Sequence, residues 1–183
     1  MQSHWRQARS ADLPDITEIA ARIHPGLAER DEVLAEKMRL FPDGCMTLVA
    51  DDAIVGYGLS HPWKLRQIPG LDDFLGALPA DADCLYLHDV AVLPEYRGRQ
   101  TAGSYIATIA TIAKSASLGS ASLGSASLGF LALVSVYGTN SFWARFGFRA
   151  VTPDAVLRAK LASYGETAKY MINDLRISRG AEA

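Results

Sequence analysis

The sequence has little cysteine and no excess of charge of either sign. Only Cys45 and Cys84 occur among its 183 residues, and their wide separation suits neither a zinc site nor a disulfide framework. We interpret them as buried free thiols in a reducing cytoplasm. The formal net charge is −2, so bulk charge gives no reason to expect nucleic acid or an anionic membrane as partner.

Long hydrophobic runs are also missing. No apolar stretch reaches the roughly 20 residues that a transmembrane helix needs, and the polar stretch Gln2–Ser10 is unlike a signal peptide. Hydrophobic residues nevertheless make up 49% of the chain and charged residues 21%, which excludes a disordered tail. We therefore expect one globular domain, located in the cytoplasm and without a metal.

The most informative stretch is a predicted strand, a basic turn and a helix start. β-Branched and aromatic residues predict a strand over 85–93, which Pro94 ends. Apolar spacing predicts a helix over 101–114. Arg97 and Arg99 lie between them among small residues, where free N–H groups at a helix start favour a pyrophosphate. By itself this pattern also fits a basic turn that binds no ligand.

The residue order in this turn resembles the acyl-coenzyme A loop of the GNAT superfamily of N-acetyltransferases. The family pattern Val-x-Pro-x-x-Arg-Gly-x-Gly-x-Gly/Ala is matched from Val92 to Ala102. One position departs, because Gln100 stands where the family usually has glycine. Since Gln100 still carries a backbone N–H, we expect binding to survive with a changed turn. The resemblance implies acetyl-CoA as cosubstrate.

A second stretch, Asn140–Phe148, resembles the family's late motif, a short helix ending in Gly-Phe beside the thiol end of the cofactor. Together the two matches imply a set of cofactor-binding residues. The backbone of β-strand residues Val90, Ala91 and Val92 would hold the pantetheine arm, with the Val92 N–H near the thioester carbonyl. The implied pyrophosphate loop comprises Arg97, Gly98, Arg99, Gln100, Thr101, Ala102 and Gly103, and the implied flank of the arm comprises Asn140, Phe142 and Trp143.

The remaining patterns predict an α/β domain with a mixed sheet. We expect strands over 5–9, 46–50, 53–59, 85–93, 130–137, 148–151 and 167–175, and helices over 10–23, 29–40, 101–114, 141–146 and 154–164. The resemblance implies about six to seven strands, flanked by helices and splayed at the central strands, and places helix 29–40 beside the acceptor. Gly56 and Gly58 would weaken their strand unless something packs close to it.

The long segment 61–83 is irregular and allows two interpretations. It is either a flap over the acceptor site that carries His61, Trp63 and Phe74, or a packed surface excursion with one short helix. The sequence does not decide between them.

His88 is the best candidate for moving the acceptor's proton, because an imidazole has an unperturbed pKa near 6.5. Tyr86 shares its strand face. In arylalkylamine N-acetyltransferases, histidines at corresponding places relay the amine's proton through water, and Tyr86-Leu87-His88 resembles that arrangement with the first histidine replaced by tyrosine. Alternatively, His88 is a structural histidine bonded to Asp89 or a carbonyl.

The sequence points less directly to the general acid, the group that would protonate the departing thiolate. Many family members carry a tyrosine four residues before the glycine of Gly-Phe, but Trp143 stands there, and an indole N–H is not a useful acid. Tyr137 lies nearby in the sequence and is the candidate substitute, unless it only packs at a strand end.

Residues 115–129 are three identical copies of Ser-Ala-Ser-Leu-Gly. A five-residue period matches neither a helix nor a strand. We expect the preceding helix to end within or just after the first copy, and the surplus copies to form a mobile loop remote from the pyrophosphate. Neutral slippage explains such a repeat, and contact with a partner or second subunit is the alternative.

These observations favour a cytoplasmic N-acetyltransferase that moves an acetyl group from acetyl-CoA to a primary amine, in a small molecule or a peptide, by direct transfer in a ternary complex. Whether it forms a homodimer is left open. Because Trp143 replaces the usual tyrosine, the alternative is a catalytically weak sensor or partner module that binds acyl-CoA. A phosphate-binding domain of another fold is disfavoured, because Gly-x-x-x-x-Gly-Lys-Ser/Thr and an early Gly-x-Gly-x-x-Gly are absent.

Overall fold

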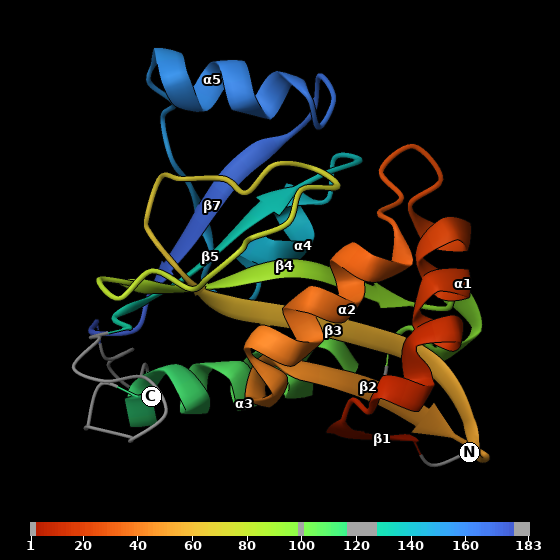
Figure 1. Cartoon of the computed structure of the whole chain (residues 1–183). Helices are drawn as coiled ribbons and strands as arrows, with labels where there is room; N and C mark the ends of the chain where they lie inside the picture. The colour runs from red at the N-terminus through yellow and green to blue at the C-terminus, as the bar shows by residue number, and fades with distance from the viewer. Residues whose placement is uncertain (1–2, 99–100, 117–127, 178–183) are drawn as a thin grey trace.

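A single seven-stranded sheet runs through the chain in the computed structural model, which describes residues 3–98, 101–116 and 128–177 (Figure 1). Its strand order is β1-β2-β3-β4-β5-β7-β6. The strands are β1 (Ser3–Gln7), β2 (Cys45–Ala50), β3 (Ala53–Trp63), β4 (Cys84–Val92), β5 (Phe130–Ser135), β6 (Arg149–Ala150) and β7 (Lys169–Asp174). Only the β4–β5 pair is parallel. The predicted mixed sheet is therefore confirmed.

Helices cover both faces of this sheet (Figure 1). They are α1 (Leu13–Ile23), α2 (Asp31–Leu40), α3 (Thr101–Ala116), α4 (Asn140–Ala144) and α5 (Ala155–Ala162). α1 and α2 pack against one face of β3 and β4, and α5 covers the same face further along, over β5 and β7. α3 packs on the opposite face.

The contact between α3 and the sheet explains Gly58 of β3. A Cβ on Gly58 would lie 2.3 Å from the ring of Tyr105, which α3 packs flat against the strand. The Tyr105 hydroxyl is 2.6 Å from Ser60 Oγ and donates to the Gly44 carbonyl at 3.1 Å. The expectation that something packs close to Gly58 is thus confirmed.

The central strands separate partway along their length. β4 and β5 pair only from Cys84–Leu87 to Phe130–Leu133, although β4 continues to Val92. On its other side β4 pairs with β3 through a register shift, in which Leu59 faces Asp89 and Ser60 faces Leu87. His88 is therefore the extra residue of a β-bulge, and bulges re-aim side chains. The bulge lies where β5 leaves β4.

Both interpretations of segment 61–83 need correction. β3 extends to Trp63, so His61 and Trp63 belong to a strand and not to a flap. Residues 64–83, all of them described, contain no helix. Phe74 is 54% exposed, and the Arg30 guanidinium lies 5.5 Å from its ring centroid.

Hydrogen bonds tie this segment to α2 and the connection before it. Arg30 Nε donates to Asp72 Oδ2 at 2.8 Å, and the N–H groups of Leu75 and Gly76 donate to the Glu36 carboxylate at 2.6 and 3.0 Å. The segment is thus a fixed wall of the fold.

Some predicted features lie outside the described residues. These are Arg99 and Gln100 of the basic turn, residues 117–127 of the repeat, and the tail 178–183. The described part of α3 reaches Ala116, within the first copy. Leu128, in the third copy, is fully buried against α3 and β5.

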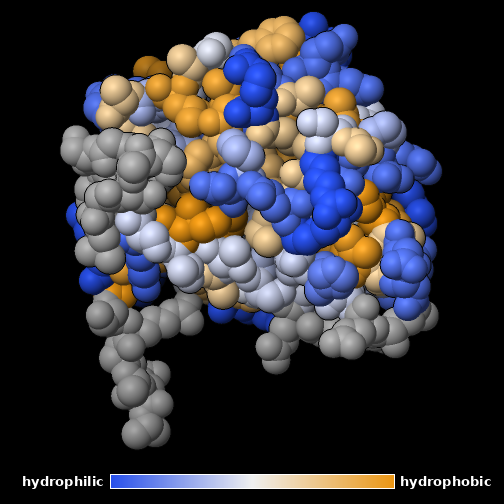
Figure 2. All heavy atoms as spheres, turned by 60° about the horizontal axis from the view of Figure 1, so that its bottom comes forward, coloured by the Kyte–Doolittle hydropathy of each residue, from blue (hydrophilic) through white to orange (hydrophobic). Residues whose placement is uncertain are grey.

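Figure 2 shows one face of the molecule, on which hydrophobic residues form several groups separated by hydrophilic ones. In the parts of the chain that the structure describes, no helix combines the length and apolarity needed to cross a bilayer.

Deleting Ser120–Gly129 should leave both thermal stability and cofactor affinity unchanged, because lengthening or shortening a surface loop costs little. Leu118 and Gly119 would then precede Phe130, in the place of Leu128 and Gly129. Calorimetric unfolding and a coenzyme A titration check this. Leu128→Ala in the full chain is the control, and should cost about 2–5 kcal/mol of unfolding free energy, as emptying a core site does. A destabilised deletion variant would show that the repeats are packed into the domain.

Candidate functional site

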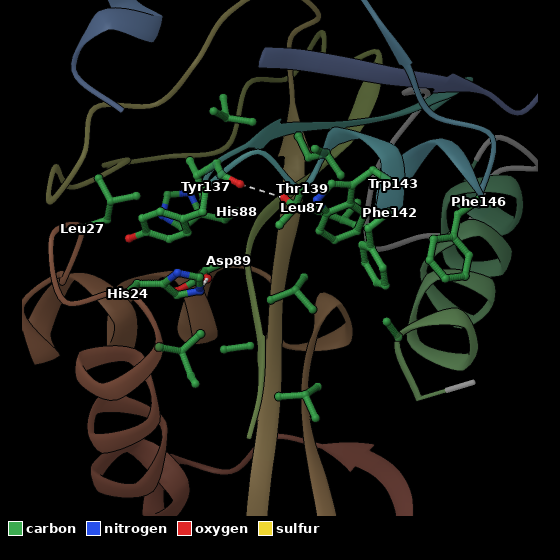
Figure 3. A pocket seen from close by; sticks show the side chains of 18 of the residues that line it. His24, Leu27, Leu87, His88, Asp89, Tyr137, Thr139, Phe142, Trp143 and Phe146 are labelled. Atoms are coloured by element: carbon green, nitrogen blue, oxygen red, sulfur yellow. Dashed lines mark hydrogen bonds and ion pairs between the residues drawn. The ribbon is translucent and has the colours of Figure 1, made fainter. Parts of the chain in front are cut away.

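A cleft of about 1190 Å³ opens where β4 and β5 diverge, and its walls come from the end of α1, β4, the start of α3, the end of β5 and α4 (Figure 3). Thirteen of the predicted site residues line it: Tyr86, His88, Val90, Ala91, Val92, Arg97, Gly98, Thr101, Ala102, Gly103, Tyr137, Phe142 and Trp143. Asn140 is not among the lining residues, and Thr139 takes that place.

The described residues of the loop before α3, Arg97 and Gly98, line one end of this cleft. Gly98 has φ +85°, a conformation that favours glycine. Its carbonyl accepts the backbone N–H and the hydroxyl of Thr101, each at 3.0 Å. Arg97 Nε donates to the Val92 carbonyl at 2.9 Å, which fixes the guanidinium beside the end of β4. A cation and a helix start thus meet at one end of the cleft, an arrangement that suits phosphate.

Aromatic side chains form the neighbouring wall. The rings of Phe142 and Trp143 are 5.2 Å apart, as are those of Phe142 and Phe146. A Cβ on Gly103 would lie 3.1 Å from the Phe146 ring, so α3 approaches this wall closely. The wall offers an apolar surface next to the phosphate end, which fits a pantetheine arm.

At the other end, His88 pairs with a carboxylate that the sequence did not single out. His88 Nε2 is 2.7 Å from Glu29 Oε2, and the two side chains are only 4% and 5% exposed. Glu29 Oε1 also accepts the Asp72 N–H at 2.9 Å and lies 3.6 Å from Lys37 Nζ. Burial raises the pKa of Glu29, but His88 and Lys37 outweigh it and hold the pKa below its usual value. Glu29 is therefore a charged group whose partners lie on β4, on α2 and in segment 64–83.

A second histidine–carboxylate pair lies beside the first (Figure 3). His24 Nε2 is 3.1 Å from Asp89 Oδ1, and the Tyr57 hydroxyl donates to the other oxygen of Asp89. Burial lowers the pKa of His24, but the Asp89 carboxylate outweighs it and the pKa is raised. The Tyr137 ring stacks on His24 at 5.8 Å, from a backbone with φ +53°. Strained backbone of this kind clusters at functional sites.

The sequence did not indicate Glu29, His24 or Thr139 as site residues. Glu29 was assigned only to the start of a helix, and His24 only to the end of one. The bulge explains both contacts, because it lets His88 and Asp89 approach the α1–α2 connection together. Asp89 was considered only as a partner of His88, whereas it pairs with His24. No local pattern in the sequence predicts such contacts.

Two further aromatic residues lie against His88. Tyr86 is 2% exposed, its ring is 6.1 Å from His88, and burial raises its pKa well above the usual value. His61 is fully buried, and burial holds its pKa well below the ordinary value. Tyr86 is thus a neutral phenol, and His61 a neutral imidazole. Among the described residues, His61 Nε2 and His88 Nδ1 have no hydrogen-bond partner.

Neither cysteine lines the cleft. Both are buried free thiols, and burial raises the pKa of Cys45 to about 12 and that of Cys84 further still. Thiols with such pKa values are poor nucleophiles. Within the described residues, no group of three or more His, Cys, Asp or Glu side chains is arranged to hold a metal ion.

Sequence comparison identifies one family. The model of the acetyltransferase (GNAT) family matches residues 13–148, which includes the basic loop and the second stretch up to Phe148. None of the curated proteins matches the chain at a significant level.

Solved structures agree on the fold. A GNAT-like decarboxylase, GphF, in complex with isobutyryl-CoA matches with a TM-score of 0.72 and 17% identity, over 94% of this chain and 100% of its own. Arabidopsis thaliana Naa50, in complex with the bisubstrate analogue CoA-Ac-MVNAL, matches with a TM-score of 0.64 and 14% identity, over 94% and 97%.

N-acetylglutamate synthase from Neisseria gonorrhoeae, complexed with coenzyme A and N-acetyl-glutamate, matches with a TM-score of 0.65 and 18% identity. The match covers 96% of this chain but only 35% of the synthase, so this chain spans about a third of that protein. At these identities the likeness concerns the fold.

Glu29→Gln should lower the unfolding free energy at neutral pH by about 1–3 kcal/mol, because it removes a buried charged acceptor from His88 and Lys37. The pKa of Glu29 is depressed in the folded state, so its contribution is present above the ordinary value of 4.5 and lost as the pH falls through the folded value. The difference between wild type and variant should therefore shrink below pH 4.5. Urea unfolding across pH measures it.

Glu32→Gln is the matched control, because Glu32 is an exposed residue of α2. It should change stability little at any pH. Equal stability of the Glu29→Gln variant and wild type at pH 7 would contradict the assigned network.

Proposed function

Since the chain belongs to the acetyltransferase (GNAT) family, we propose that it transfers an acetyl group from acetyl-CoA to a primary amine by direct attack in a ternary complex. The observation that carries the proposal is a single cleft with two different ends. One end has the loop around Arg97 and the start of α3, and the other has the buried His88–Glu29 pair.

The cofactor would lie along the part of β4 that β5 has left. The Leu93 N–H donates to the Val55 carbonyl on the β3 side at 2.9 Å. Because successive N–H groups of a strand point to opposite sides, those of Val90 and Val92 point toward the opening. They are available to the pantetheine arm. Because Val92 lies beside Arg97 at the phosphate end, the Val90 N–H, which is nearer to His88, is better placed than that of Val92 for the thioester carbonyl, where negative charge develops during attack. Arg97 and the loop Gly98–Gly103 would hold the pyrophosphate, while Phe142 and Trp143 flank the arm.

His88 would act as the base. Its Nε2 is held by Glu29 at 2.7 Å, which orients the ring. Its Nδ1 is buried and has no partner among the described residues, so the ammonium proton would reach it through a water molecule that enters with the acceptor. The free amine then attacks the thioester carbon and the new C–N bond forms. As the tetrahedral intermediate collapses, the C–S bond breaks, and the second proton of the nitrogen passes through water to the phenolate that is left when Tyr137 protonates the thiolate.

Tyr137 would donate a proton to the departing thiolate. It lines the cleft and stacks on His24. Burial, with a further contribution from the Asp89 carboxylate, raises the pKa of Tyr137, so the phenol keeps its proton at neutral pH. Direct transfer is favoured over an acyl-thiol intermediate, because both cysteines are buried outside the cleft.

Arg97→Ala should weaken coenzyme A binding by about 1–3 kcal/mol, the scale of a lost charge-assisted hydrogen bond. Isothermal titration calorimetry measures it, and added salt should reduce the difference. Arg158→Ala on exposed α5 is the matched control and should bind as wild type does. An unchanged dissociation constant in the Arg97 variant would refute the phosphate role.

His88→Ala should lower kcat at least about 100-fold, the lower scale of general-base catalysis, and leave the dissociation constant of coenzyme A nearly unchanged. Wild-type turnover should fall at acid pH, because a base must be unprotonated to accept a proton, and this acid limb should be absent from the variant. A pH–rate profile by thiol release checks both points.

His24→Asn is the comparison that separates the two histidine–carboxylate pairs. If the acid limb survives His88→Ala and disappears in His24→Asn, the base is His24 and the role assigned to His88 is wrong.

A further inference from the structure

The structure assigns a class to the acceptor: we infer that it is a primary amine on an uncharged apolar chain, with no carboxylate beside the amine. The inference rests on the proposed function, because it concerns the acceptor end of the same cleft.

Apolar side chains surround that end. Ile23 ends α1, and Leu27 follows in the connection to α2. Leu71 comes from segment 64–83, and Tyr86 and Tyr164 complete the wall from β4 and from the residues after α5. The Tyr164 hydroxyl donates to the Pro69 carbonyl at 3.0 Å, which fixes segment 64–83 in place. This lining suits an apolar chain and offers few partners to a polar one.

Two carboxylates lie close to the place where the amine would bind. The carboxylates of Glu29 and Asp89 both belong to this end of the cleft, and each is held charged by its histidine partner. An arriving ammonium group is attracted to them, whereas a carboxylate on the neighbouring carbon is repelled. The buried Nδ1 of His88, which has no partner among the described residues, lies at the same end of the cleft.

Among the described residues, no Lys or Arg side chain lies at the acceptor end of the cleft, and the His24 imidazole there is already paired with Asp89. Among the described lining residues the only Lys or Arg side chains are Arg97 and Arg145. Both belong to the segments that would hold the cofactor, before α3 and after α4. Lys37 lies 3.6 Å from Glu29 but is 1% exposed and does not line the cleft. Charge complementarity therefore favours an amine over an amino acid.

The test uses acceptors that differ only in the carboxylate. Thiol release from acetyl-CoA would be measured with 3-methylbutylamine against leucine, and with 2-phenylethylamine against phenylalanine. Leucinamide controls for size, because it has the bulk of leucine without the negative charge. Propylamine controls for the length of the apolar chain.

We expect kcat/KM to be at least about tenfold higher for each amine than for its amino acid, the scale of one unfavourable charge contact. Leucinamide should group with the amine, and propylamine should be poorer than 3-methylbutylamine. Equal or better turnover of leucine would overturn the inference while leaving the proposed function intact. A lack of turnover with all acceptors, in a protein that still binds coenzyme A, would overturn both.

A substitution can reverse the preference. Leu27→Arg introduces the missing cation, and should lower kcat/KM for 3-methylbutylamine and raise it for leucine, so that their ratio falls at least about tenfold. Leu27→Met, similar in length and uncharged, should keep the wild-type ratio. Leu71→Arg introduces the cation from segment 64–83, and it replaces Leu27→Arg in the test if that variant does not fold. An unchanged ratio in a folded arginine variant would contradict the placement of the acceptor.

Discussion

The divergence of β4 from β5 after Leu87 is the constraint on which the rest of the site depends. A strand that loses its neighbour exposes backbone N–H and C=O groups that must find other partners. Here those groups border a cleft. The edge of β4 can stay unpaired there because a ligand or solvent can hydrogen-bond to its backbone groups. The same divergence lets the start of α3 and the aromatic residues of α4 meet beside the cleft.

The bulge at His88 places titratable side chains beside this opening. Without the extra residue, His88 and Asp89 would lie on opposite faces of the sheet. With it, both meet the connection between α1 and α2, where His24 and Glu29 lie five residues apart. In each pair the charged form of the carboxylate survives burial because the histidine stabilises it. Burial alone would have neutralised these groups.

Glu29 links the reaction site to the wall of the acceptor end. It accepts a hydrogen bond from the Asp72 backbone as well as holding His88, and Arg30 next to it binds the Asp72 side chain. The orientation of the proposed base and the position of Leu71 therefore depend on the same carboxylate. A change that tunes the base would also move part of the acceptor wall.

Local patterns in the sequence determined most of the elements, because strand and helix periodicities are properties of neighbouring residues. They also determined the loop proposed to hold the cofactor, whose small residues and arginine lie within one turn. The tertiary structure alone decided that β3 continues through His61 and Trp63, because this part of the strand pairs with β4 and packs against Tyr86 and His88 despite the proline that follows His61. It alone decided the pairs His88–Glu29 and His24–Asp89, because contacts across 59 and 65 residues depend on strand register and on a bulge. Neither register nor bulge has a signature in the local sequence.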